Sequence, residues 1–277
     1  SLKSATDLHL DEQLEAFRGF MDALTVPNPR QLVLIQPQLI PEQLFDLPTA
    51  RNRGYHAYPP MGLLYIAAVA KEVNPELEVK VIDLNYEILR HSQSEQFDYR
   101  IWEQQLYDAI ESCDAPHIGV TCMFGTTKHN FVEVSRFIRE NFPAAPILSG
   151  GVQATYDYQE LLEAGLCDIV FRNEGELQIK SFLERCGNPN SDVYPSGSAF
   201  RWQGQVYELG TQHEDVPMDW DLRPHYPLVN VQDYNNYGSL AAFSRMVGDD
   251  KKFATILSNR GCRARCTFCT VRDFNGF

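Results

Sequence analysis

Three cysteines close together in the sequence are the residues whose spacing most clearly predicts chemistry. Cys262, Cys266 and Cys269 are separated by three and then two residues. Thiolates this close can all bind one inorganic centre, but a structural zinc site takes four protein ligands, and no fourth Cys or His lies near these three. A cubane iron–sulfur cluster usually takes four thiolates, so one held by three keeps an iron open for an exchangeable ligand. The spacing favours such a cluster, with a zinc knuckle or unrelated free thiols as the alternatives.

The segment around these cysteines resembles a known signature. An apolar run over residues 253–257 predicts a strand directly before them. With Phe268 as the aromatic residue, C-x3-C-x-Φ-C resembles the motif of radical S-adenosylmethionine (SAM) enzymes. The resemblance implies a [4Fe–4S] cluster on Cys262, Cys266 and Cys269, with Phe268 near the cluster and SAM, which one electron cleaves to a 5'-deoxyadenosyl radical. Residues 251–277 would then be the first strand and cluster loop of a (β/α) barrel, truncated at Phe277.

The composition argues against several classes of protein. A net charge of −13 at pH 7 does not suit nonspecific nucleic-acid binding, which needs clustered Lys and Arg to displace counterions. The sequence has no run of about 18 apolar residues, so it predicts no membrane span, and acidic residues near its start do not fit a signal peptide. Seven cysteines, an odd number, do not suggest a disulfide framework. We expect a protein of the reducing cytoplasm, which an oxygen-sensitive cluster would require.

The larger part of the chain alternates predicted strands and helices. Residues 8–25 carry apolar side chains at helical spacing, and we expect an amphipathic helix there, within an amino-terminal segment 1–30. Between residues 31 and 185, apolar runs predict five strands with helices between them, which is typical of a doubly wound parallel sheet. The predicted strands are residues 31–36, 78–83, 117–123, 146–149 and 168–172.

In an open parallel sheet, a ligand binds beyond the carboxyl ends of the strands, at the topological switch point. The loops predicted at those ends are rich in Gly, Thr and Ser, which suits close backbone approach to a polar ligand. The residues alone therefore predict a domain for a nucleotide-sized ligand, without naming the ligand. The loops are residues 37–59, 121–127, 149–155 and 172–176.

Three stretches of this region together resemble the cobalamin-binding, Rossmann-like domain that precedes the barrel in cobalamin-dependent radical SAM enzymes. They are residues 58–63 (YPPMGL), 149–155 (SGGVQAT) and 168–176 (DIVFRNEGE). The resemblance, over about residues 31–185, implies a cobalamin site with backbone approach or hydroxyl donation from one turn and a pocket lining from the neighbouring strand end. A tight strand–helix turn is the alternative reading of each glycine. The turn residues are Ser149, Gly150, Gly151, Val152, Ala154 and Thr155, and the lining residues are Thr121, Phe124, Gly125 and Thr126.

One departure from other cobalamin domains concerns the metal. Those of the mutase and methionine-synthase type carry Asp-x-His-x-x-Gly after the first strand, and its His binds cobalt from below. Here the corresponding loop begins Gln36-Pro-Gln and lacks that motif, and we interpret His56, the loop's one histidine, as solvated or structural. We therefore expect no histidine beneath the cobalt. Glu174 and Glu176 are interpreted as acids at a helix amino terminus, with contact to corrin amides as the second choice.

The rest of the chain is less specific. Residues 186–250 are predicted as a hairpin over 198–209 followed by a Pro- and Asp-rich linker that resembles the strap between the two domains of the family. We expect the four cysteines outside the cluster motif to be buried as small apolar residues. These are Cys113, Cys122, Cys167 and Cys186.

The resemblance implies an enzyme that transfers a methyl group to an unactivated carbon by means of a 5'-deoxyadenosyl radical and methylcobalamin. The substrate would be a small molecule or a peptide or other natural product, and the electron would come from a flavodoxin- or ferredoxin-type protein. Ring formation or rearrangement, as in porphyrin-ring cyclases, is one alternative. A non-catalytic corrinoid-binding module is another, and a nucleotide-binding domain with a zinc knuckle is the third.

Overall fold

The computed structural model describes residues 5–210, 216–217, 219–239, 256–257, 260–264, 266–271 and 274. The strands are β1 (Gln31–Gln36), β2 (Glu78–Asp83), β3 (His117–Thr121), β4 (Ile147–Gly150), β5 (Ile169–Phe171), β6 (Ser198–Trp202) and β7 (Gln205–Leu209). The helices are α1 (Ala5–Asp22), α2 (Leu47–Arg51), α3 (Met61–Val73), α4 (Leu84–His91), α5 (Ile101–Glu111), α6 (Lys128–Asn141), α7 (Val152–Glu163), α8 (Glu176–Gly187) and α9 (Tyr234–Tyr237). Short 3-10 turns cover Glu42–Leu44, Gly125–Thr127, Tyr226–Leu228 and Val231–Asp233.

The strands form one mixed sheet in the order β2-β1-β3-β4-β5-β6-β7. The first five are parallel, as predicted, whereas β6 and β7 are antiparallel additions to β5. The prediction of a five-stranded sheet with the hairpin outside it was therefore wrong. The hairpin pairs with β5 through Ala199 and Phe200, both fully buried, and so covers backbone groups that an edge strand would leave unpaired.

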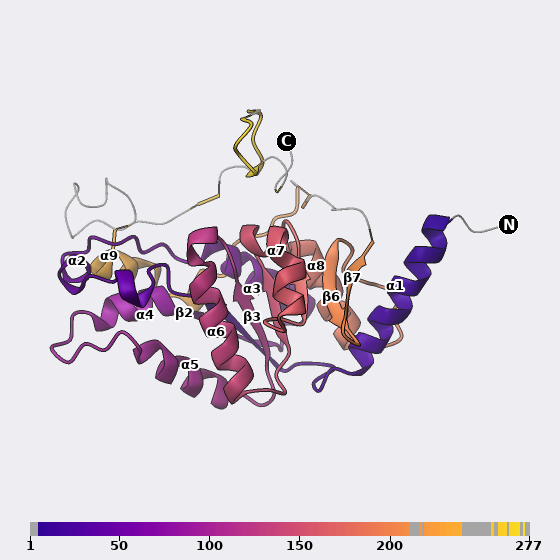
Figure 1. The fold of residues 1–277 in the computed structure, drawn as a ribbon, viewed down its shortest axis with the longest axis horizontal. Helices are drawn as coiled ribbons and strands as arrows, with labels where there is room; N and C mark the ends of the chain where they lie inside the picture. Colours follow the sequence, from indigo (N-terminus) through magenta and orange to yellow (C-terminus); the bar gives the residue numbers. More distant parts are fainter. Residues whose placement is uncertain are drawn as a thin grey trace.

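Alternate residues of the strands supply two separate cores, because successive side chains of a strand point to opposite faces. Val33 and Ile35 of β1 pack with α5, α6 and α7 on one face. Leu32 and Leu34 pack with α1, α3 and α8 on the other. Figure 1 shows helices in front of and behind the strands, which confirms the doubly wound arrangement.

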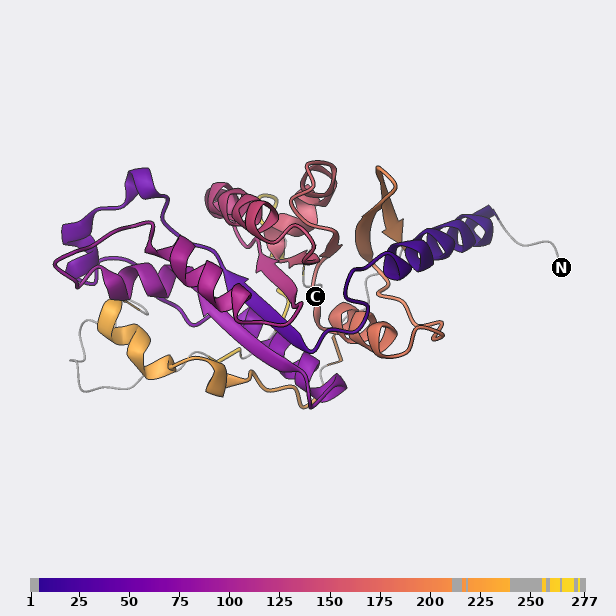
Figure 2. The same cartoon turned by 90° about the horizontal axis from the view of Figure 1, so that it is seen from below.

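Helix α1 lies beside the hairpin, far from β2 (Figure 2). Phe17 and Phe20 pack on Phe200, with ring centroids 5.5 and 5.2 Å away. The Gly210 backbone N–H donates to Gln13 at 3.0 Å. The predicted amphipathic helix is confirmed, and its apolar side closes one end of the second core. None of the described helices is both long and apolar enough to cross a membrane.

Residues 219–239 run back along the β2 side of the sheet, where α9 lies beside α4 (Figure 2). The His225 backbone N–H donates to the Leu64 carbonyl at 3.0 Å. Tyr234 is buried, stacks on Tyr86 at 4.6 Å and donates its hydroxyl to Asp83 at 2.9 Å. Much of the segment predicted as a linker is thus packed against the domain. The strand predicted over 253–257 falls mostly outside the described residues, so the start of a barrel is not confirmed.

Candidate functional site

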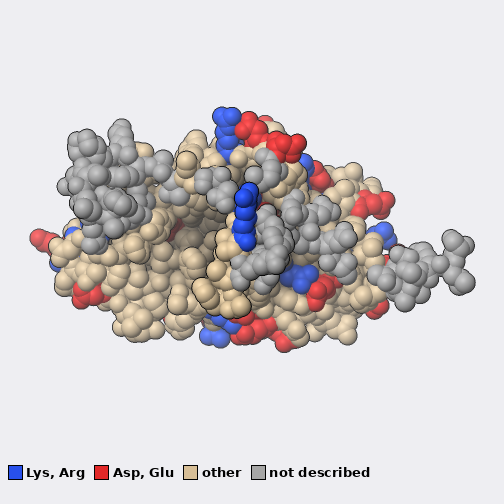
Figure 3. All heavy atoms as spheres, turned by 90° about the horizontal axis from the view of Figure 1, so that it is seen from above, with Lys and Arg blue, Asp and Glu red and all other residues tan. Residues whose placement is uncertain are grey.

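The topological switch point lies between β1 and β3. After β1 the chain crosses through α3 to β2 on one side, and it then returns to β3 on the other side of β1. The loops that follow β1 and β3 therefore leave the sheet in opposite directions and open a crevice at its carboxyl edge. Figure 3 looks down on this edge, and the surface is hollowed near its middle.

The Gly150-Gly151 turn joins β4 to α7 in close contact with the end of β3. Gly151 has φ +104°, and a Cβ there would lie 2.7 Å from the Cys122 carbonyl oxygen. That oxygen accepts the Ala154 N–H at 3.1 Å, and the Cys122 N–H donates to the Gly150 carbonyl at 2.8 Å. The tight strand–helix turn is therefore present, and helix α7 begins at Val152 rather than at 156 as predicted.

The two predicted hydroxyl donors of this turn bond to the protein backbone. Ser149 Oγ donates to the Val120 carbonyl at 3.0 Å. Thr155 Oγ1 donates to the Gly151 carbonyl at 3.0 Å and accepts the Asn173 N–H at 2.8 Å. Both hydroxyls hold neighbouring loops together, so their contact with a cofactor stays a prediction.

The residues predicted to line a pocket from β3 differ in accessibility. Thr121 is half-buried, with its hydroxyl 3.5 Å from the Gly150 carbonyl oxygen. Phe124 is 55% exposed, and Gly125 and Thr126 are exposed on the 3-10 turn before α6. Among the predicted cobalamin residues, this turn offers the most open surface at the switch point.

Two buried carboxamides at the switch point were missed by sequence reasoning. Gln38 follows β1 and Asn130 lies in the first turn of α6, and Asn130 Nδ2 donates to the Gln38 carbonyl at 2.6 Å. Gln38 Nε2, Gln38 Oε1 and Asn130 Oδ1 are buried and have no hydrogen-bond partner within the described part of the chain. A glutamine directly after an apolar strand and a proline was the available signal, but its burial depends on helix α6.

The segment with the cysteines contacts this carboxyl edge through Arg260. Arg260 pairs with Glu174 at 3.0 Å and with Glu176 at 2.6 Å, and it lies 5.5 Å from the centroid of the Tyr65 ring. Burial lowers the pKa of Arg260, but its bonds to Glu176 and Glu174 outweigh this and raise the pKa above its ordinary value. Glu174 and Glu176 precede and begin α8, as predicted, but the arginine that pairs with them was missed.

The three cysteines of the motif are free and exposed. Figure 1 shows their segment, in yellow, above the carboxyl ends of the strands. Asn173 Nδ2 donates to the Phe274 carbonyl at 3.1 Å, whereas Phe268 is 88% exposed. The described residues contain no group of three His, Cys, Asp or Glu side chains that could hold a metal ion. The donors suit an iron–sulfur cluster, but the structure does not bring the three thiols together.

The predicted burial of the four other cysteines is confirmed for three of them. Cys122, Cys167 and Cys186 are buried, and Cys113 is half-buried. Burial raises the pKa of Cys122 and of Cys186 to about 12 and also raises the pKa of Cys167. These three buried thiols stay protonated and are poor metal ligands, since the ligand is the thiolate.

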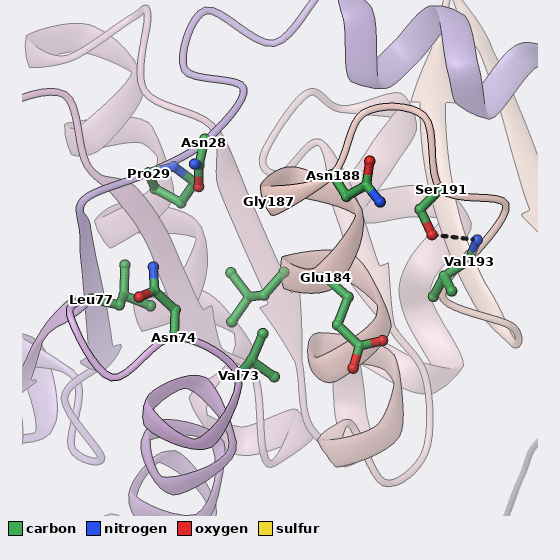
Figure 4. Close-up of a pocket in the computed structure, with 11 residues that line it drawn as sticks. Asn28, Pro29, Val73, Asn74, Leu77, Glu184, Gly187, Asn188, Ser191 and Val193 are labelled. Atoms are coloured by element: carbon green, nitrogen blue, oxygen red, sulfur yellow. Dashed lines mark hydrogen bonds between the residues drawn. The ribbon is translucent and has the colours of Figure 1, made fainter.

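Two surface cavities lie away from the switch point. One, of about 440 Å³, opens at the amino edge of the sheet between the ends of α3 and α8, where Asn74, Asn188 and Glu184 line it (Figure 4). The other, of about 570 Å³, lies between α4, α5 and residues 228–234. A doubly wound sheet binds its ligand at the switch point, where neither cavity lies, so we do not assign either cavity to the cofactor.

Comparison with known proteins now bears on this geometry. A family model for the B12 binding domain matches residues 51–183. Those residues are a B12-binding domain. The matched range contains β3, β4, β5 and the Gly150-Gly151 turn but begins after Gln38. The unpaired side-chain amide of Gln38, the unpaired Oδ1 of Asn130 and the exposed turn before α6 suit an amide-rich polar cofactor at this edge.

The chain is distantly homologous to cobalamin-dependent radical SAM enzymes. It is 24% identical over 243 residues to the cytidylyl-2-hydroxyethylphosphonate methyltransferase of Streptomyces wedmorensis, covering 78% of this chain and 45% of that protein. It is 30% identical over 154 residues to the anaerobic magnesium-protoporphyrin IX monomethyl ester cyclase of Synechocystis, covering 54% and 28%. The chain thus spans less than half the length of these curated relatives.

One solved structure shares the fold over most of the chain. It is the cobalamin-dependent S-adenosylmethionine radical enzyme OxsB with aqua-cobalamin and S-adenosylmethionine bound. The TM-score is 0.58 at 17% identity, with 87% of this chain and 28% of that chain covered. At this identity the likeness shows a common fold.

Proposed function

We propose that this chain binds cobalamin in the crevice between the ends of β1 and β3 and belongs to a radical SAM enzyme that methylates an unactivated carbon. One observation carries the proposal: Arg260 anchors the three-cysteine segment on the carboxyl edge of the sheet, which is the edge where an open parallel sheet binds its ligand. A cluster on these cysteines would therefore face the cobalamin site.

The proposed function needs two sites, one for cobalamin and one for the iron–sulfur cluster. The turn at Gly150 and Gly151 and the exposed turn before α6 would hold the cobalamin. Cys262, Cys266 and Cys269 would hold a [4Fe–4S] cluster, with Phe268 beside it. When bound, the cluster with SAM supplies radical initiation, and cobalamin supplies a transferable methyl group. The Arg260 contacts would keep the two sites in register, and the electron would come from a flavodoxin- or ferredoxin-type protein.

Ring formation is the second candidate, favoured by the 30% identity to the magnesium-protoporphyrin ester cyclase. The match to the phosphonate methyltransferase covers more of this chain, 78% against 54%, and so methyl transfer stands first. A small molecule or a peptide or other natural product is the proposed substrate. The proposed location is the cytoplasm, where an oxygen-sensitive cluster is protected.

The proposal is tested by reconstituting the chain without oxygen in the presence of iron, sulfide and hydroxocobalamin. We expect about four irons and one cobalt per chain, together with the broad visible absorbance of a [4Fe–4S] cluster. Replacing Cys262, Cys266 and Cys269 together by Ala should remove the iron and leave the cobalt. Cys113→Ala is the matched control and should keep both metals.

The outcomes separate the candidate functions. Zinc in place of iron would overturn the cluster. Cobalt without iron would leave only the corrinoid-binding module, and the absence of cobalt would overturn the cofactor site. With both metals bound, methyl transfer and ring formation are separated by feeding SAM labelled in its methyl group, because only methyl transfer leaves the label in the product.

A further inference from the structure

At the switch point, Gln38 and Asn130 carry buried polar atoms that no described residue bonds to. Gln38 is 1% exposed and Asn130 is 0% exposed. The bond between Asn130 Nδ2 and the Gln38 carbonyl already ties the loop after β1 to helix α6. The two atoms of the Gln38 amide and Asn130 Oδ1 are left without partners among the described residues. Buried polar groups are nearly always hydrogen-bonded, so these three atoms need a partner.

Two other glutamines with a buried amide oxygen show what is particular to Gln38. Gln178 Nε2 donates to the Arg172 carbonyl at 2.8 Å, and Gln105 Nε2 donates to Glu87 at 3.1 Å. Each of these amides lacks a partner only at its oxygen, and a buried oxygen without a partner is less rare than a buried donor without one. Gln38 lacks a partner at its donor nitrogen as well. A buried N–H group without a partner is rare in a folded protein and indicates a missing ligand or water.

The unpaired atoms define the chemistry of the missing partner. They are one NH2 donor and two carbonyl acceptors, carried by two residues that the bond from Asn130 to the Gln38 backbone carbonyl holds together. A primary carboxamide presents both a donor and an acceptor. The rim of the corrin ring carries acetamide and propionamide arms of this kind. We infer that Gln38 and Asn130 receive one primary-amide arm of bound cobalamin. This inference rests on the proposed function and adds a contact outside the matched residues 51–183.

The burial of both side chains sets a condition on binding. An amide arm can reach Gln38 only after a local opening of the loops that follow β1 and β3. The free chain then carries the unpaired atoms, and the complex satisfies them. Removal of the Gln38 amide should therefore leave the free chain as stable or more stable and should weaken the binding of cobalamin. Removal of a purely structural amide would instead destabilise the free chain.

The first test measures cobalamin affinity by equilibrium dialysis and stability by urea unfolding in Gln38→Met. We expect cobalamin to bind about tenfold more weakly, which is the effect of about one to two lost hydrogen bonds. The stability of the free chain should be unchanged or higher, because the side chain keeps its size and loses its unpaired atoms. Gln105→Met is the matched control and should bind cobalamin as the wild type does. A destabilised Gln38→Met chain with unchanged affinity would overturn the inference.

The second test needs no variant. Cobalamins in which one primary-amide arm, an acetamide (a, c or g) or a propionamide (b, d or e), is hydrolysed to a carboxylate lose the donor of that arm. The wild type should bind one of these analogues about tenfold more weakly than cobalamin, and Gln38→Met should bind that analogue and cobalamin alike. Equal affinity of the wild type for cobalamin and for all of the analogues would overturn the inference alone. Failure of the wild type to bind cobalamin at all would overturn both this inference and the proposed function.

Discussion

At the scale of single residues, backbone geometry requires glycine at position 151, whereas Gln38 stands out by its unpaired side-chain amide. Gly151 has φ +104°, and the Cys122 carbonyl and the Thr121 hydroxyl stand 2.7 and 3.1 Å from where a Cβ would be. The turn therefore depends on glycine twice, through its conformation and through the space it leaves. This is a structural requirement, and it holds whether or not a cofactor is bound.

We predict that Gly151→Ala destabilises the chain by about 1–3 kcal/mol, the cost of holding a residue with a side chain in such a conformation. The matched control is Gly62→Ala, in helix α3, where an added Cβ meets nothing within 4 Å. Alanine favours a helix over glycine, so the control should be neutral or more stable. Urea unfolding of both variants checks this, and equal stabilities would contradict the geometric argument.

Single residues were predictable where their own chemistry decides their role. The Gly150-Gly151 turn and the buried thiols could be read from the sequence, because a pair of glycines after a strand marks a turn and cysteine is an apolar residue in a core. The pairing of Arg260 with Glu174 and Glu176 could not. Their partners are set by how distant segments pack, and the sequence carries no local sign of it.

At the scale of elements, Arg260 anchors the cysteine segment on the loop between β5 and α8. Its side chain is 17% exposed, and the carboxylates of Glu174 and Glu176 are 4% and 9% exposed. The Arg260 guanidinium pairs with both carboxylates and offsets the repulsion between two negative charges in a place of low solvent access. These ion pairs are the charged part of the attachment, beside the bond from Asn173 to the Phe274 carbonyl.

We predict that Arg260→Met releases this segment, since breaking a buried ion pair costs about 3–5 kcal/mol. Amide hydrogen exchange of a peptide covering residues 260–264 should quicken on the order of a hundredfold, which corresponds to about 3 kcal/mol at the lower end of that cost. Arg263→Met changes an exposed arginine of the same segment and should leave the exchange rate as in the wild type. Similar rates in both variants would show that the ion pairs do not hold the segment.

The elements themselves were predicted unevenly. The positions and parallel direction of β1 to β5 followed from apolar runs that alternate with helical periodicity, because each crossover helix returns the chain to the same edge of the sheet. The attachment of β6 and β7 did not, since a hairpin carries the same alternation whether it pairs with another strand or stands alone. Helix α4 was also missed. It begins directly after β2, where the Asp83 side chain accepts the Tyr86 N–H at 3.0 Å and caps the helix.

At the scale of the whole molecule, Asp83 links the sheet, α4 and residues 219–239. It ends β2, caps α4 and accepts the Tyr234 hydroxyl at 2.9 Å. Burial raises the pKa of Asp83 to about 7, although the bonds from Tyr86 and Tyr234 oppose the shift. A carboxyl group that binds its proton more tightly in the folded chain than in the unfolded chain stabilises the fold at low pH.

We predict that this contribution is lost as the pH rises from about 4 to about 7. Between the ordinary pKa of 3.8 and the folded value of about 7, the folded chain binds more protons than the unfolded chain, so stability falls with rising pH. The full loss is on the order of 4 kcal/mol. Asp83→Asn keeps the cap without the titration, and the difference in unfolding free energy between it and the wild type should change across this range. A constant difference from pH 4 to pH 8 would contradict the assignment.

The packing of α1 against the hairpin determines when α1 can dock during synthesis of the chain. Gln13 and Gly210, which bond to each other, lie 197 residues apart. At about 5–20 residues per second, roughly 10 to 40 s of synthesis separate them. During that time Phe17 and Phe20 have left the ribosome and Phe200 has not. Helix α1 therefore docks only after the hairpin has emerged. A nascent chain that stalls before the hairpin presents the apolar side of α1, without this partner, to chaperones and proteases.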